Sequence, residues 1–177
     1  YKLPTYEVTF DSYKEAYQPG DTVQMRGWAK TYSGVPVQDA KVSYKVCREP
    51  ALWWFRRSDC PSEELRVDTV VTADDGSFVL KMPMVYPEDV DLNHAVYYHV
   101  VAYAKVTDNA GETHEEQATL ALSNRSAVLK VDLPSKTLRD SLKTFTVTRT
   151  NLAQESIEGD VRYCFDGRAW KTAEANK

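Results

Sequence analysis

The 177-residue sequence predicts an all-β protein: a seven-stranded antiparallel immunoglobulin-like sandwich followed by the first strands of a second β-domain. Three observations predict this fold. Apolar and polar residues alternate with a period of two, apolar residues at helical spacing are nearly absent, and turn-forming residues separate the alternating runs. Alternate residues of a strand lie on opposite faces of a sheet, so two such sheets can bury their apolar rows against each other.

Three alternating runs form the first part of the predicted sandwich. The turn Gln18-Pro19-Gly20-Asp21 separates the first run, residues 6–10, from the second, residues 22–30. A loop that opens at Ser33-Gly34 precedes the third run, residues 42–46. In the second run we expect Val23, Met25, Gly27 and Ala29 to face inward and Thr22, Gln24, Arg26 and Lys30 to face outward.

Four further strands complete the predicted sandwich. Leu65, Val67 and Val71 indicate the fourth strand, and Asp74-Asp75-Gly76 forms a tight turn into a fifth over residues 78–82. A polar stretch, residues 87–93, then precedes a long strand over residues 96–106. The turn at residues 108–111 leads into a last strand over residues 112–122. Seven short strands with turns between them are typical of an immunoglobulin-like sandwich.

A break in the alternation at Ser123-Asn124-Arg125-Ser126 predicts a domain boundary. We therefore expect one domain over residues 1–122 and a partial second β-domain over residues 123–177. Only three or four strands fit in the second segment, and so few strands bury one face at best. We expect that face to be covered by the first domain or by a second copy of the chain in a homodimer.

The charge distribution disfavours nucleic acid and membranes as partners. The net charge is −4, and acidic and basic residues are mixed, so no basic stripe is available for phosphates or anionic lipids. No apolar run approaches the ~20 residues of a membrane-spanning helix. The first residues, YKLPTYEV, do not resemble a signal peptide. Because the chain begins at Tyr1, we expect a piece of a larger exported protein whose export signal lies upstream.

The sequence contains no motif for catalysis, so we predict a protein that is not an enzyme, with no catalytic, cofactor-binding or metal-binding residues. It lacks a G-x-S-x-G elbow, a phosphate-cradling glycine loop and a metal-ligand spacing such as H-E-x-x-H. Asp74, Asp75 and Glu112 offer too few oxygens for a calcium loop, which favours a plain hairpin turn. The histidines are His94, His99 and His114.

Two cysteines bracket a loop rich in aromatic residues. A disulfide between Cys47 and Cys60 would close this short loop and contribute up to about 3 kcal/mol by the chain-entropy model. The alternative is two unpaired thiols, and Cys164 is left over in either case. Three cysteines are too few for a disulfide-based scaffold.

The loop between these cysteines carries Trp53, Trp54 and Phe55 in succession. Adjacent residues of a strand point to opposite faces, so all three cannot lie in one core. Aromatic residues beside arginines are typical of interfaces, and Trp28 on the outward row of its strand can extend the patch. We predict an interface there. The alternatives are a loop that folds back on its own domain and a surface that stacks on carbohydrate.

Three stretches of the sequence share a common pattern with a known family: KLPTYEVTF, AYQPGDTVQMRGWAKTYSGVPVQDAKVSYKVCRE and TADDGSFVLKMPM. They resemble a macroglobulin domain of the alpha-2-macroglobulin family, particularly its bacterial members. The shared features are the L-P-x-[aromatic]-E-V phrase at Leu3 to Val8, the P-G-D turn, T-Y-x-G-x-P-V at Thr31 to Val37, and D-G-x-F at Asp75 to Phe78. The resemblance covers about residues 1 to 122; beyond Ser123 a further macroglobulin domain is inferred from position and alternation.

The resemblance implies a macroglobulin-type sandwich within a cage of such domains that changes shape when a protease cuts a bait segment. The chain would then be a non-catalytic structural part that contacts neighbouring domains of its parent chain, and proteases would bind through the full-length protein. The implied location is the periplasm or the outer membrane. The thioester of trapping relatives needs a cysteine before Glu-Gln, and Glu115-Glu116-Gln117 lacks one. The alternative function is a surface adhesin or a carbohydrate-binding module.

Overall fold

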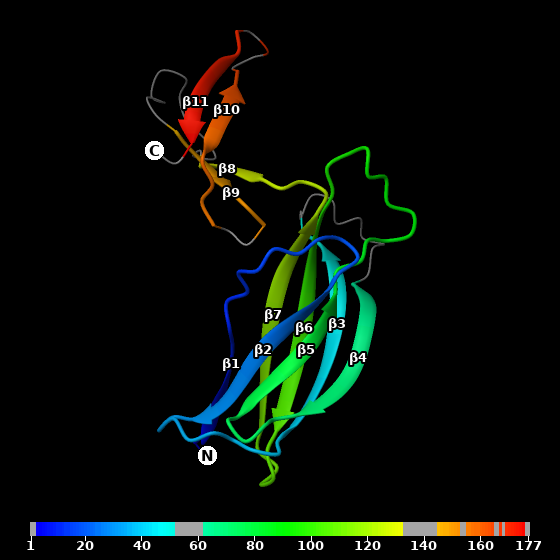
Figure 1. Ribbon diagram of the computed structural model, residues 1–177, viewed down its shortest axis with the longest axis vertical. Coiled ribbons are helices and arrows are strands. Elements are labelled where there is room, and N and C mark those ends of the chain that lie inside the picture. Colours follow the sequence, from blue (N-terminus) through cyan, green and yellow to red (C-terminus); the bar gives the residue numbers. More distant parts are fainter. Residues whose placement is uncertain are drawn as a thin grey trace. The chain divides into compact units, whose positions relative to one another are not determined.

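The computed structural model describes residues 3–51, 62–132, 145–152, 155–164, 167 and 169–175. Its regular elements within these ranges are all β-strands. No helix of the described residues is long and apolar enough to span a membrane. The chain divides into two compact units, Tyr1–Asn124 and Arg125–Lys177, and the division falls inside the Ser123 to Ser126 stretch (Figure 1).

The first unit is a sandwich of two antiparallel sheets. One sheet has the order β1-β2-β5 and the other the order β4-β3-β6-β7, and Figure 1 shows the two as separate layers. This arrangement confirms the predicted all-β fold class. The strands are β1 (Tyr6–Phe10), β2 (Thr22–Thr31), β3 (Lys41–Pro50), β4 (Glu63–Val71), β5 (Ser77–Pro83), β6 (Tyr97–Thr107) and β7 (Thr113–Ser123).

The core lies between the sheets and consists of the predicted inward rows. Val23, Met25 and Ala29 of β2 are buried, while the outward Gln24 and Arg26 are exposed. The other buried core residues are Tyr6, Val8, Ala40, Val42, Tyr44, Val46, Phe78, Leu80, Met82, Met84, Val100, Ala102, Ala104, Val106, Ala118, Leu120 and Leu122.

The tight turn between β4 and β5 requires a glycine for two reasons. Gly76 has a φ of 79°, and a Cβ placed on it would lie 2.4 Å from the carbonyl oxygen of Ala29. A left-handed residue without a side chain is therefore needed where this turn approaches β2. This explains the D-G-x-F phrase in local terms.

Strand β4 is present where the fourth strand is predicted, but a bulge changes which of its residues face the core. Val67 and Val71 are 65% and 57% exposed, whereas Leu65 and Val70 pack against the core. The pairing of β3 with β4 shifts at Val46/Cys47, where Leu65 is the unpaired extra residue. Such a bulge reverses the faces on which later residues point.

The second unit contains two antiparallel strand pairs. One pair is β8 (Val128–Asp132) with β9 (Thr146–Thr150), and the other is β10 (Gly159–Tyr163) with β11 (Lys171–Ala175). Within the described part of this unit Val161 alone is buried, and the rings of Phe145 and Tyr163 meet edge to face at 5.9 Å. That its apolar face is covered by the first domain or a second copy stays a prediction.

Candidate functional site

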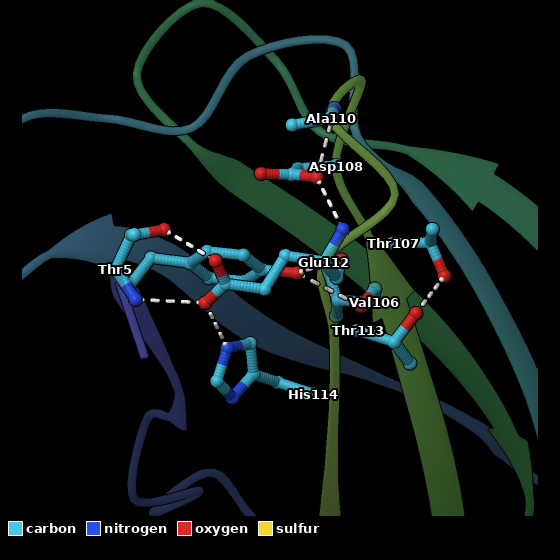
Figure 2. Close-up of polar contacts among 9 residues, drawn as sticks. Thr5, Val106, Thr107, Asp108, Ala110, Glu112, Thr113 and His114 are labelled. Atoms are coloured by element: carbon cyan, nitrogen blue, oxygen red, sulfur yellow. Dashed lines mark hydrogen bonds and ion pairs between the residues drawn. The ribbon is translucent and has the colours of Figure 1, made fainter. Parts of the chain in front are cut away.

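A polar cluster fixes the beginning of β1 to the beginning of β7, and we call it the N-terminal lock. It consists of Thr5, Glu112 and His114, which are labelled in Figure 2, together with Tyr6. The carboxylate of Glu112 accepts hydrogen bonds from the N–H of Thr5 at 2.7 Å and from its Oγ1 at 2.8 Å. His114 Nε2 donates to the same carboxylate at 2.8 Å. Residues 107 positions apart in the sequence are thereby joined across the two sheets.

Tyr6 is the buried member of this lock, with 1% of its surface exposed. Its hydroxyl lies 3.0 Å from the carbonyl oxygen of Val106 and 2.9 Å from that of Glu112, so its single proton serves two acceptors. Its ring meets the His114 ring edge to face, with centroids 4.3 Å apart. In this chain the aromatic position of the L-P-x-[aromatic]-E-V phrase therefore contributes both a buried ring and a hydroxyl donor.

The turn between β6 and β7 holds Glu112 in place from the other side. Asp108 Oδ1 accepts the N–H of Ala110 at 2.9 Å and that of Glu112 at 2.8 Å. Between them Gly111 adopts a φ of 83°. Figure 2 shows this chain of contacts running from Ala110 through Asp108 to Glu112. The side chain of Glu112 is therefore presented to Thr5 by a turn with its own hydrogen bonds.

The pKa values of two members of the lock, Glu112 and Tyr6, are shifted in opposite directions. Hydrogen bonds from His114 and then from Thr5 lower the pKa of Glu112 to about 2. Burial, followed by the charges of Asp108 and Glu112, raises the pKa of Tyr6 to about 12. Glu112 is thus ionised and Tyr6 neutral at ordinary pH. A general acid needs the opposite, a carboxyl pKa raised toward neutrality, so the arrangement suits a structural role.

A second cluster, the C-terminal lock, fixes the opposite end of β7 and comprises Tyr17 and Asn124. Asn124 Nδ2 donates to the carbonyl oxygens of Leu92 at 2.9 Å and His94 at 2.8 Å. Its Oδ1 accepts the N–H of Val96 at 3.1 Å. The two locks are separated by the eleven residues of β7, which span about 36 Å at about 3.3 Å per residue.

Tyr17 completes the C-terminal lock. It is partly buried, and its hydroxyl donates to the carbonyl oxygen of Ala121 at 2.5 Å. Because Tyr17 lies in the segment between β1 and β2, this hydrogen bond is a second link between the two sheets. Both ends of β7 are therefore tied to the N-terminal part of the chain.

Of the predicted aromatic interface, the structure describes Trp28. It lies on the outward row of β2, where its Nε1 donates to Asp11 Oδ1 at 2.9 Å and Lys30 Nζ lies 4.2 Å from the ring centroid. Lys30 thus contacts the ring of Trp28 in a cation–π interaction. Trp53, Trp54 and Phe55 lie outside the described residues, so the interface stays a prediction.

The predicted disulfide also stays a prediction, because Cys60 lies outside the described residues. Cys47 is 4% exposed, and burial raises the pKa of its thiol. Beside it is a residue that sequence reasoning missed. The Arg48 side chain is 3% exposed, forms an ion pair with Glu63, and donates to the carbonyl oxygen of Val85 at 2.6 Å.

Two of the three residues weighed as calcium ligands, Asp75 and Glu112, form other hydrogen bonds. Asp75 Oδ1 accepts the N–H of Ser77 at 2.9 Å within the hairpin turn, and Glu112 belongs to the N-terminal lock. Within the described ranges, no group of three or more histidine, cysteine, aspartate or glutamate side chains is placed to hold a metal ion. His99 is exposed on β6, and His94 Nε2 lies 3.6 Å from Asp91.

Comparison with known proteins gives likenesses of structure alone. No protein-family model matches the chain, and no curated protein matches it. Native alpha-2-macroglobulin of E. coli matches all of this chain over 13% of its own, with a TM-score of 0.59 and 10% identity. For the E. coli protein activated by porcine elastase, the match covers 99% of this chain and 18% of the E. coli chain, with a TM-score of 0.58 and 13% identity. A Salmonella alpha-2-macroglobulin matches all of the chain over 14% of its own, with a TM-score of 0.58 and 11% identity.

These likenesses confirm, at the level of the fold, the resemblance predicted from the sequence. They extend over the whole chain, including the segment after Ser123, where the sequence features are weak. The chain spans 13 to 18% of the length of the alpha-2-macroglobulins it matches. It is therefore similar to a small part of a large multidomain protein.

Proposed function

We propose that this chain is a non-catalytic structural part of an alpha-2-macroglobulin-like protease inhibitor of the bacterial cell envelope, where it acts as a stiff spacer between neighbouring domains. The observation that supports this proposal is the pair of locks at opposite ends of β7. The chain begins β1 at one end of the sandwich and leaves β7 at the other. Both places are fixed by side chains that connect segments next to different strands.

A spacer needs a body that does not deform between its attachment points. The apolar rows of both sheets are buried continuously along β2, β3, β5 and β6. Protein interiors packed in this way have low compressibility and transmit strain. The locks add polar contacts at the two ends, where strands would otherwise fray.

The proposal extends to partners and location. The contacts of the chain would be with neighbouring domains of its own parent chain, and proteases would be met through the full-length protein. Elastase and trypsin activate the E. coli alpha-2-macroglobulins to which the chain is similar, which supports proteases as the molecules acted on by the parent. We propose the periplasm or the outer membrane as its location.

A protease-shielding assay on the full-length protein encoded by the parent gene tests this function. We expect a protease treated with that protein to lose activity on a large protein substrate and to keep activity on a small peptide substrate. The 177-residue chain alone is expected to change neither activity. Unaltered activity on both substrates, together with binding on a glycan array, would instead support the adhesin or carbohydrate-binding function.

A further inference from the structure

Strand β4 forms an edge of the four-stranded sheet, and among the residues that the structure describes β3 is the strand with which it pairs. After its bulge, the outer face of β4 presents Val67, Thr69 and Val71, all of them exposed and all β-branched. The segment contains neither proline nor glycine. An exposed edge of this kind is a template for pairing with another strand.

At the centre of the open edge, the backbone N–H of Thr69 already has a hydrogen-bond acceptor. Its N–H donates to Oδ1 of Asp68 at 2.8 Å. Oδ2 of Asp68 in turn accepts from Nη2 of Arg66 at 2.5 Å. Alternate residues of an antiparallel strand direct their N–H groups to the same side, so the N–H groups of Val67, Thr69 and Val71 share the open edge. Asp68, held by Arg66, therefore caps the middle donor of this row.

We propose that β4 is a latent pairing site for a second copy of this chain, kept closed by the carboxylate of Asp68. An antiparallel pairing centred on Thr69 makes the exposed row self-complementary. Val67 then lies opposite Val71 of the second copy on both sides of a Thr69–Thr69 pair. Aliphatic β-branched pairs and threonine pairs directly opposite each other stabilise sheets.

Charge and register also favour this occupant. In the pairing centred on Thr69, Asp68 lies opposite Val70, so no two like charges face each other. A twofold axis at Thr69 keeps the two outer faces on the same side, as an isologous interface requires. A pairing centred on Asp68 would oppose two aspartates, and one centred on Val67 would place the bulge residue Leu65 in the ladder.

Sedimentation velocity over a concentration series tests the proposal on the 177-residue chain. We expect the wild type to sediment as a monomer of 20.1 kDa. Asp68→Ala removes the cap and is expected to lower the dimer dissociation constant by about tenfold or more, which corresponds to about 1.4 kcal/mol. Asp68→Asn loses the same charge and keeps an acceptor oxygen for the Thr69 N–H, so it should resemble the wild type.

Two further variants test whether the dimerisation depends on the edge of β4 and not on the loss of a negative charge. Asp91→Ala removes the same charge and the same kind of hydrogen bond, since Asp91 Oδ1 accepts the N–H of Asn93 at 2.9 Å, and it should remain monomeric. Adding Val67→Lys to Asp68→Ala should restore the monomer because it places two lysines in the pairing face. Circular dichroism checks that each variant is folded, and Asp68→Val replaces Asp68→Ala if the alanine variant is not.

The proposal is overturned by any of three results. The first is that a folded variant without the Asp68 carboxylate, Asp68→Ala or Asp68→Val, associates no more than the wild type. The second is a dimer of that variant that persists when Val67→Lys is added. The third is Asp91→Ala dimerising as strongly as Asp68→Ala, which would make the loss of negative charge the cause.

Discussion

Removing the Tyr6 hydroxyl is the most direct test of the N-terminal lock. Tyr6→Phe keeps the buried ring and deletes the donor that serves the carbonyl oxygens of Val106 and Glu112. The carbonyl oxygen of Glu112 keeps a second donor, the N–H of Asp108 at 3.0 Å, so the loss is that of the hydroxyl's own hydrogen bonds, about 0.5–1.5 kcal/mol. For a unit of this size, about 1 kcal/mol corresponds to about 4 °C in Tm, so we expect Tm to fall by about 2–6 °C.

Tyr86 provides a matched control for this substitution. Its hydroxyl is buried and has no hydrogen-bond partner among the described residues. Tyr86→Phe deletes the same atom and should leave the free energy of unfolding unchanged or raise it, because burying an unpaired hydroxyl is unfavourable. Differential scanning calorimetry of the intact chain measures both variants through the transition of the first unit.

The difference in Tm shift between the two variants shows whether the hydrogen bonds of the Tyr6 hydroxyl stabilise the fold. Equal shifts in Tm would mean that the hydroxyl of Tyr6 contributes no more than an unpaired one, and the reasoning behind the N-terminal lock would be wrong. A shift confined to Tyr6→Phe would assign the loss to the hydrogen bonds, since the apolar ring remains in both variants.

Three further predictions concern the lock and the core. The folded-state pKa of Glu112 is about 2 against an ordinary 4.5, so its stabilisation is complete above about pH 4.5 and is lost as the pH falls toward 2; Tm measured against pH should therefore decline less steeply in acid for Glu112→Gln than for the wild type. Gly27→Ala should cost about 1–3 kcal/mol in urea unfolding, because its Cβ would lie 2.3 Å from Cζ of Phe78, and an unchanged midpoint would contradict this close contact. Met82→Ala, at a site with 0% exposure, should cost about 2–5 kcal/mol, while its outward neighbour Lys81→Ala should stay within about 0.5 kcal/mol of the wild type.

The sequence predicts the fold wherever the alternation of apolar and polar residues in a strand depends on that strand alone. The second run predicts its inward and outward rows correctly because β2 is regular from Thr22 to Thr31. The fourth run gives the right strand, but it does not show which residues face the core, because the single extra residue at Leu65 arises from pairing with β3. A bulge depends on the partner strand, and the period of one strand alone does not reveal it.

The two locks depend on contacts that the sequence does not place. Tyr6 is readable as a core residue, but its hydroxyl partners lie about a hundred positions away, across the sandwich. Arg48, by contrast, had a readable signal. It occupies the next inward position after Val42, Tyr44 and Val46, and a charge in such a row requires a partner. The ion pair of Arg48 with Glu63 meets that requirement.

The N-terminal lock matters most because β1 is a weakly attached strand. It is an edge strand of five residues that, within the described ranges, pairs only with β2, beginning at Tyr6 opposite Thr31. A pull on the chain before β1 would separate these pairs one after another, since short edge elements open at low free energy. The hydrogen bonds from Thr5 to Glu112 carry that pull directly to the start of β7, whose far end is fixed by Asn124. Force and orientation can then pass along β7, the edge strand that pairs with β6, as the proposed spacer role requires.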